Sequence, residues 1–397
     1  MRPFGLTVLG IDTAGSSQKE ILLGGIRRDQ ALRFRETVLS MARTESEDSN
    51  EVTENPPGER TLLTRSVKDI VTYGLTINFF LWVAVTLGAI FGAGDATEKI
   101  FSWVAERVQL EDVITAMQAG GSFPGNLLLA SGLVLVVILL LSLVSVLGAL
   151  FRYYGYRLTV DGKTYVRTSG LLTRHEESMK RHKIQAIVLR QNFIARFFKR
   201  MNMQLRVASA GSGVDNGQVP TGTQATFMIP VLRPAEISEF GEEFLPGCEI
   251  DAPGYSRLNR RRLTAIVLGL VTLCVLPVAG ILGFLVSWKF HAIPLLALLV
   301  AWLAVNRYWK NSGYAVAGEY GFVRHGFVGS RTTVFPLFKV QRADITQSPG
   351  QRRRGLASLS IHLASHSLTV PHMDAADAHK IRDMALYYVE SSNRAWY

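Results

Sequence analysis

The tetrapeptide His182-Lys183-Ile184-Gln185 has a counterpart 156 residues later in the chain, Phe338-Lys339-Val340-Gln341. The same separation relates Gln191 to Gln347, so the match extends beyond the tetrapeptide. Repeats with a long period decide the architecture of a protein before any local pattern does. A separation that is shared by several positions therefore predicts one duplicated unit.

Each repeated unit ends in the same order of elements: an apolar-alternating strand, a second short strand, and a helix that begins near an Ala. The three copies of this order span Leu6 to Arg43, Met203 to Leu245 and Leu359 to Ser392. The first copy lacks the tetrapeptide block, because the chain starts only a few residues before its strand. We therefore expect two complete modules, preceded at residues 1–43 by the C-terminal part of a first module.

Four apolar runs separate the repeated units, and we expect them to be transmembrane helices. A helix needs roughly 20 apolar residues to cross a bilayer core of about 30 Å, and three of the runs reach that length. The predicted helices cover residues 70–94, 127–150, 263–286 and 291–308. The fourth run is the shortest, and it spans only if its aromatic end at residues 307–309 lies at the membrane interface.

The placement of Lys and Arg predicts how these helices are oriented. Lys and Arg cluster outside each hairpin, whereas the connection at residues 95–126 contains only Lys99 and Arg107 against five carboxylates. By the positive-inside rule this connection is extracytoplasmic, and both termini and all modules are cytoplasmic. The net charge of +11 then faces the anionic inner leaflet. The two cysteines predict no disulfide, since Cys274 falls inside the third apolar run.

Two folded modules are predicted at residues 152–246 and 310–392. Both contain several short alternating strands and end in a helix, at residues 234–244 and 375–389. We expect membrane α-helical hairpins combined with α+β cytoplasmic modules, each a small split β-barrel or sandwich closed by its C-terminal helix. Residues 44–59 carry six carboxylates and almost no apolar side chain, which predicts a disordered acidic linker.

A basic and aromatic segment of the second module is the candidate binding site. Basic side chains interleaved with Phe can hold a domain against anionic lipid headgroups through charge attraction and ring insertion. The third module has three consecutive arginines at the equivalent place. The candidate membrane-surface contacts are Lys180, Arg181, Lys183, Arg196, Lys199, Arg200, Arg352, Arg353 and Arg354. The alternative is that these charges form a solvated face, while Phe193, Phe197 and Phe198 belong to the core.

The sequence offers little for catalysis. His362 and His366 lie four residues apart and His372 is near, but residues four apart on a strand share a face without converging on a metal unless loops cooperate. No nucleophile elbow, phosphate-binding loop or zinc-ligand spacing occurs. We therefore expect no enzymatic activity, no catalytic residue, no cofactor and no bound metal. Nucleic acid is not an expected partner either, because topology already explains the basic residues.

Taken together, these motifs resemble the YdbT-type family of bacterial membrane proteins, which carry several pleckstrin-homology-like (PH-like) domains of the second bacterial type. In the second module the resemblance rests on Tyr156-x-Leu-Thr, Gly170-Leu-Leu, Lys183-Ile184-Gln185, Gln191 and Arg196-Phe197. In the third module it rests on Tyr314-Ala-Val, the turn at Gly326, Lys339-Val340-Gln341 and Gln347-Ser348-Pro349. Family members usually begin with a hairpin and a whole first module, so this start inside a module indicates a late start site or a fragmentary gene model.

The resemblance implies a fold, a location and a role. The modules would be seven-stranded PH-like barrels with a C-terminal helix, in a multi-pass protein of the bacterial cytoplasmic membrane. Such domains act mostly in interaction or oligomerisation, and some family members are associated with tolerance of membrane-active antimicrobial peptides. The implied partners are membrane lipids, a second copy of the chain, or a smaller PH-like membrane protein. A transporter or channel component is the alternative, although acidic residues are nearly absent from the apolar runs.

Overall fold

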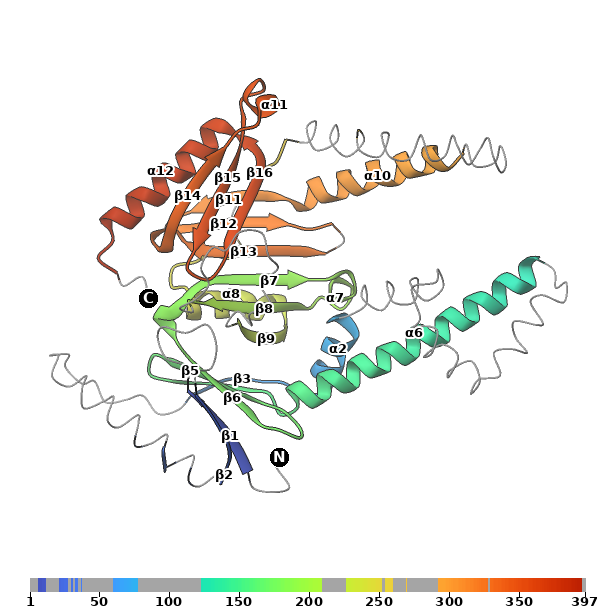
Figure 1. The fold of residues 1–397 in the computed structure, drawn as a ribbon, viewed down its shortest axis with the longest axis vertical. Coiled ribbons are helices and arrows are strands. Elements are labelled where there is room, and N and C mark those ends of the chain that lie inside the picture. Colours follow the sequence, from blue (N-terminus) through green and yellow to red (C-terminus); the bar gives the residue numbers. More distant parts are fainter. Residues whose placement is uncertain are drawn as a thin grey trace. The chain divides into compact units, whose positions relative to one another are not determined.

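The chain is shown as a computed structural model in Figure 1. The structure describes residues 6–11, 21–27, 60–77, 123–208, 226–251, 254–259, 292–327 and 329–394, and the single positions 30, 33, 34, 37 and 269. Contacts divide the chain into two compact units. The larger unit comprises residues 1–62, 158–167 and 176–397, and the smaller unit comprises residues 63–157 and 168–175.

A seven-stranded sheet with the order β10-β11-β12-β13-β7-β8-β9 is the centre of the larger unit. Its strands are β7 (Ile184–Gln191), β8 (Met201–Val207), β9 (Thr226–Leu232), β10 (Ser256–Arg257), β11 (Gly313–Ala317), β12 (Tyr320–His325) and β13 (Ser330–Pro336). Strands β7 to β9 belong to the second module, and β11 to β13 belong to the third. One continuous sheet therefore joins the two copies of the repeat.

The join is the antiparallel pairing of β13 with β7, which lie next to each other in Figure 1. The register runs from Arg331 opposite Arg190 to Val334 opposite Ile187. Strand β7 also pairs with β8 on its other side, and its first six residues are buried. A near-continuous apolar run is the pattern expected of a strand that is covered on both faces.

The remaining described strands form three further sheets, and all three sheets are open. The three-stranded sheet contains β14 (Val340–Thr346), β15 (Leu356–Leu363) and β16 (Ser367–Asp374) in that order. The four-stranded sheet contains β3 (Arg60–Thr64), β4 (Arg157–Asp161), β5 (Thr164–Ser169) and β6 (His175–Lys180) in that order. A separate pair contains β1 (Leu6–Ile11) and β2 (Ile21–Arg27).

The prediction of closed barrels from the sequence is wrong. Strand β13 does not close a barrel within its own module, because its outer edge bonds to β7 of the neighbouring module. The two modules thus satisfy each other's strand edges, which leaves open sheets instead of two closed ones. An edge strand presents unpaired backbone groups that readily accept another strand.

A buried lysine reinforces the junction between the modules. Short 3-10 turns precede β7 and β14, namely η2 (Arg181–Lys183) and η4 (Leu337–Lys339). The Lys339 side chain is only 6% exposed, and its Nζ donates to the backbone oxygens of His182 and, at 2.7 Å, Ile184. Burial lowers the pKa of Lys339 to about 8. A buried ammonium group requires such hydrogen-bond acceptors, because an unpaired buried charge is strongly unfavourable.

The hydrophobic core also crosses the junction. The core of the third module contains Phe335, Leu337, Leu359 and Ile361, and it includes Ala186 from β7. Since Ala186 is fully buried, the second module completes the core of the third. The burial of Ala186 among side chains of the third module makes this junction part of a packed interior.

The predicted C-terminal helices are confirmed. They are α8 (Pro234–Phe244), which begins with Pro as predicted, and α12 (Ala375–Ser391). The Asp374 carboxylate caps α12 by accepting from the Ala376 amide at 2.9 Å. Helix α10 (Ala292–Asn311), which coincides with the apolar run predicted at residues 291–308, directly precedes β11.

In the smaller unit, α2 (Val67–Ile77) packs against α6 (Phe123–Tyr153). The rings of Tyr73 and Tyr153 meet edge to face with centroids 4.9 Å apart. A Cβ at Gly74 would lie 2.6 Å from the Val146 Cα, so only glycine permits this approach. The Ser145 hydroxyl donates to the Gly74 carbonyl at 2.7 Å and satisfies a polar group at the contact.

The membrane hairpins that we expected are also not observed. Among the residues that the structure describes, no helix is both long and apolar enough to cross a membrane. Helix α2, described from Val67 to Ile77, buries Ile70 and Tyr73, and residues 78–94 of the predicted first span lie outside the described residues. The predicted linker at 44–59, most of the connection at 95–126 and nearly all of the span at 263–286 lie outside the described residues. The domain boundaries stay a prediction.

Lys339→Met tests the junction directly. This substitution keeps the length of the side chain but leaves two backbone acceptors without their donor, so we expect a loss of about 1–3 kcal/mol in the free energy of unfolding. Denaturant unfolding followed by circular dichroism measures the change. Lys183→Met, measured at a concentration where the chain is monomeric, is the matched control, because Lys183 occupies the same place in the second module and is exposed. Equal destabilisation by both variants would contradict the role of Lys339.

Candidate functional site

Two short helices at equivalent places in the repeat carry many of the candidate contacts. Helix α7 (Phe193–Phe197) follows β7, and α11 (Pro349–Arg352) follows β14 after the same separation of 156 residues. In α11, Ser348 and Gln351 form a reciprocal capping box, with Pro at the first helical position. Each helix forms the tip of the connection between two strands of its module.

The α7 tip, residues 193–200, combines exposed rings with exposed charges. The side chain of Phe197 is 82% exposed, and Phe193 and Phe198 are also exposed. Arg196 and Lys199 are exposed beside these rings, and Arg200 is half-buried. The interpretation that these Phe residues belong to the core is therefore wrong. Large apolar side chains among cations on a protein surface are typical of a binding surface.

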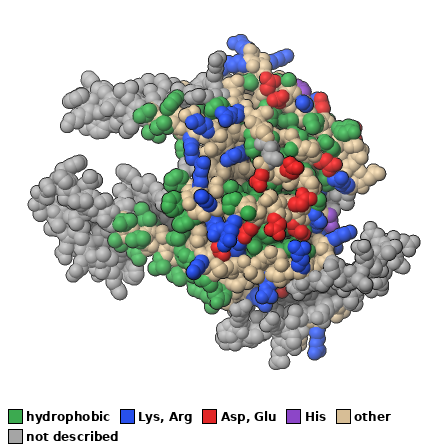
Figure 2. Space-filling model, turned by 180° about the vertical axis from the view of Figure 1, so that it is seen from behind, with side chains coloured by type: hydrophobic (Ala, Val, Ile, Leu, Met, Phe, Trp, Pro, Cys, Tyr) green, Lys and Arg blue, Asp and Glu red, His purple; other side chains and the backbone are tan. Residues whose placement is uncertain are grey.

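The α11 tip, residues 349–354, is basic without being aromatic. Arg352, Arg353 and Arg354 are all exposed. These arginines lie at the helix that corresponds to α7, as the 156-residue repeat predicts. Figure 2 shows one face of the molecule, on which Lys and Arg side chains lie both beside hydrophobic side chains and beside Asp and Glu side chains.

The remaining candidates do not join the α7 tip. Lys180 ends β6, and Arg181 and Lys183 belong to η2 at the beginning of β7. Helix α7 follows the end of β7, which has eight residues. At about 3.3 Å per residue, the strand separates the two groups by about 25 Å. The sequence motif that we treated as one basic cluster is therefore two surfaces, the α7 tip and an η2 group.

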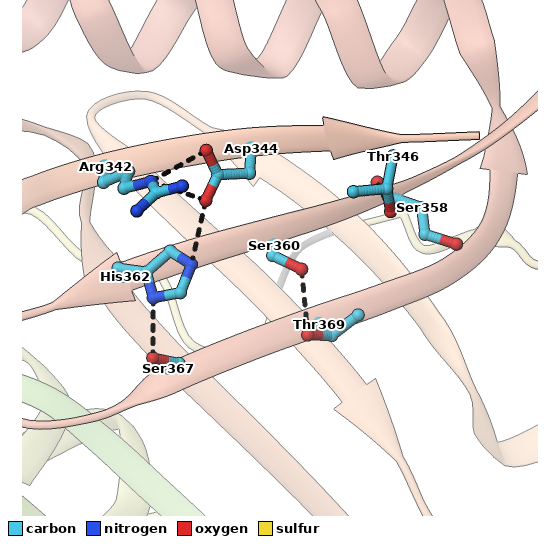
Figure 3. Close-up of polar contacts among 8 residues, drawn as sticks. All are labelled: Arg342, Asp344, Thr346, Ser358, Ser360, His362, Ser367 and Thr369. Atoms are coloured by element: carbon cyan, nitrogen blue, oxygen red, sulfur yellow. Dashed lines mark hydrogen bonds and ion pairs between the residues drawn. The ribbon is translucent and has the colours of Figure 1, made fainter. Parts of the chain in front are cut away.

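A row of polar side chains crosses the sheet β14-β15-β16, as Figure 3 shows. The Asp344 carboxylate lies 2.7 Å from Arg342 Nε and 3.2 Å from His362 Nε2. On the other side of the imidazole, His362 Nδ1 lies 2.8 Å from the Ser367 hydroxyl. Ser, His and Asp also form nucleophilic triads in hydrolases. Here, the three side chains follow the cross-strand register of an exposed sheet face, which accounts for their contacts as ordinary cross-strand pairs.

The three histidines singled out in the sequence have separate partners. His362 contacts Asp344 and Ser367, as described above, whereas His366 Nδ1 lies 2.8 Å from the Ser365 hydroxyl. His372 Nδ1 lies 3.0 Å from Gln351 Nε2. Among the described residues, no three His, Cys, Asp or Glu side chains are grouped as a metal site would require.

Cationic side chains gather on the sheet at the junction of the modules. The register places His325 opposite Arg331 and Arg331 opposite Arg190, in one row across β12, β13 and β7. Burial, with Arg190 and Arg206 nearby, lowers the pKa of Arg331 to about 10. Burial, with Arg206 and Arg331 nearby, lowers the pKa of His366 to about 4. A further positive charge at this junction is therefore unfavourable.

Sequence reasoning missed both the junction lysine and this cationic row. Lys339 was part of the repeated tetrapeptide, so the motif pointed to it, but its acceptors lie 155 and 157 residues away in the sequence. Arg331 and His325 belong to no motif. Their proximity to Arg190 follows only from the pairing of β13 with β7.

A family model described as Bacterial PH domain matches residues 103–243 and 245–389, more than half of the chain. The chain belongs to the bacterial PH domain family, and the two matches agree with the duplication inferred from the tetrapeptides.

A named relative confirms the resemblance found in the sequence. The chain is 24% identical over 386 residues to the UPF0699 transmembrane protein YdbT of Bacillus subtilis (strain 168). The alignment covers 94% of this chain and 75% of YdbT. The name of this relative describes it as a transmembrane protein.

His366 predicts a pH dependence of stability. Its folded pKa of about 4 lies below the ordinary value of 6.5, so the unfolded chain binds more protons between these two values. The free energy of unfolding should therefore decrease as the pH falls through this window. We expect thermal unfolding midpoints measured from pH 7 to pH 4 to decrease less for His366→Gln than for the wild type. The control His379→Gln changes an exposed histidine of α12 and should follow the wild type; identical profiles for all three proteins would refute the prediction.

Proposed function

We propose that the chain is a non-enzymatic, membrane-associated interaction protein whose bacterial PH modules contact an anionic lipid surface and assemble with protein partners. The observation that carries this proposal is the α7 tip, where an almost fully exposed Phe197 lies between the exposed cations Arg196 and Lys199. The rings can enter the headgroup region while the cations remain with the phosphates. Neither group needs to change its conformation in order to bind.

Two further observations support association with a membrane. Helices α6 and α10 expose apolar side chains such as Leu139, Leu143, Leu299 and Leu303. Exposed apolar surface of this kind is unfavourable in water and marks an interaction surface. The relative YdbT is named a transmembrane protein. We place the modules at the cytoplasmic face of the bacterial cytoplasmic membrane, where a net charge of +11 meets anionic lipid.

The assembly part of the proposal rests on the junction between the modules. The second and third modules of this chain bind each other through the edges of their sheets, where β13 pairs with β7. Strand addition of this kind is a general mode of protein recognition. The partner can be a second copy of the chain or a smaller PH-like protein. A role in envelope stress or in antimicrobial-peptide tolerance stays a prediction.

Vesicle binding tests the lipid part of the proposal. Each Lys or Arg near an anionic surface contributes about 1 kcal/mol, so Arg196→Ala with Lys199→Ala should weaken binding about 30-fold. Replacing Arg352, Arg353 and Arg354 by Ala should weaken it by about 100-fold or more at low ionic strength. Co-flotation of the purified chain with vesicles of phosphatidylglycerol and phosphatidylcholine measures both effects.

The matched control removes exposed lysines elsewhere on the larger unit, by Lys163→Ala with Lys380→Ala. This variant should bind the vesicles like the wild type. Phe197→Ser separates the two contributions, since its effect should persist at high salt, where charge attraction is screened. Unchanged flotation of both tip variants would eliminate the lipid surface as the ligand of these helices.

A further inference from the structure

Strand β6 is the counterpart of β13 in the repeat, but the two strands differ in exposure. A shift of 156 residues places His175–Lys180 on residues 331–336. Strand β13 is buried over its last four residues, and β7 pairs with its outer edge from Ser330 to Val334. Strand β6 ends the four-stranded sheet, and all its residues except Met179 are exposed. Strand β6 thus occupies the same position in the repeat as β13. No described strand pairs with its outer edge, whereas β7 pairs with the outer edge of β13.

Lys183, in the 3-10 turn η2 that follows β6, also differs in burial from its counterpart in the third module. Its counterpart Lys339 is buried and donates to the backbone oxygens of His182 and Ile184. Lys183 ends η2 and is exposed. Strand β6 and Lys183 therefore reproduce one side of the junction, namely the strand edge and the lysine that follows it.

Strand β14 supplies the complementary surface. It is the counterpart of β7, with the same Lys, the same Gln and the same short helix around it. Strand β7 pairs on both sides, with β13 and with β8. Strand β14 pairs with β15 and ends its sheet, so its other edge is open among the described strands.

We propose that β6 of one copy of this chain pairs antiparallel with β14 of a second copy, repeating the junction that β13 forms with β7. The inference rests on the proposed function and specifies its protein partner. Transferring the register by 156 residues places Glu177 opposite Asp344 of the second copy, as Thr333 is opposite Val188. Lys183 Nζ then donates to the backbone oxygens of Phe338 and Val340 of the second copy.

The charges at this contact are compatible with pairing. Glu177 and Asp344 are both acidic, but each has its own cation: Arg167 lies 2.7 Å from Glu177, and Arg342 lies 2.7 Å from Asp344. The existing junction also contains like charges directly opposite each other, Arg331 and Arg190. A like-charged pair of this kind weakens association without preventing it.

A second copy fits β6 better than an unrelated strand does. The junction requires an open strand edge and, next to it, two backbone oxygens placed to accept from a lysine. Strand β14 and η4 combine these features in the same order as β7 and η2. Because β6 and β14 are different surfaces, the contact is head to tail, and it generates a ring or a filament.

Crosslinking between two tagged populations of the full chain tests this contact. In a background of Cys248→Ser and Cys274→Ser, one population carries Glu177→Cys and the other carries Asp344→Cys. Opposite residues of paired antiparallel strands are close enough for a disulfide. After mixing and mild oxidation, we expect a disulfide-linked dimer that carries both tags, identified on non-reducing gels and by mass spectrometry. Ile345→Cys in place of Asp344→Cys is the control, since neighbouring residues of a strand point to opposite faces.

The lysine supplies a second readout. Lys183→Met should weaken self-association about tenfold or more, as followed by analytical ultracentrifugation, because two charge-assisted hydrogen bonds are lost. Lys310→Met changes an exposed lysine at the end of α10 and should leave association unchanged. Equal crosslinking at positions 344 and 345, or no crosslinking at either, would overturn the inference. If vesicle binding persists in that case, the proposed function stands; if vesicle binding and self-association are both absent, the proposed function fails too.

Discussion

The pairing of β13 with β7 is the constraint on which the rest of the larger unit depends. It turns two short sheets from different copies of a repeat into one seven-stranded sheet. Lys339 is buried at the edge of this join and donates to backbone oxygens of the other module. The core of the third module is likewise completed by Ala186 of β7. Neither module is therefore an independent closed barrel, since each depends on an edge of its neighbour.

This constraint also determines where the binding surfaces lie. Strand β7 is held on both sides, so the elements at its two ends, η2 and α7, are displayed on a rigid support. The exposed Phe197 and its neighbouring cations are at one end, and Lys183 is at the other. One strand thus separates the surface that we assign to lipid from the surface that we assign to a second copy. A rigid support fixes both surfaces before any partner binds, which reduces the entropy lost on binding.

Much of the repeat was predictable from the sequence, whereas the way in which its copies join was not. The tetrapeptides 156 residues apart identified the duplication, and Pro234 together with the segment after Asp374 identified the closing helices. Alternation predicts that a segment is a strand but does not specify its neighbour, so the pairing of β13 with β7 and the open sheets were missed. The apolar runs indicated hydrophobicity alone. The packing of Tyr73, in the first run, on Tyr153, just after the second run, is known only from the coordinates. The basic residues were identified individually, but β7 divides them into two groups.

Hydrogen exchange of the backbone amides tests the junction most directly. It should be followed by mass spectrometry at a concentration where the chain is monomeric. Amides of β13 and β7 should exchange slowly and together, because each strand is bonded on both sides, whereas those of β6 should exchange rapidly from an open edge. Exchange of β13 as fast as that of β6 would show that the two modules do not share one sheet.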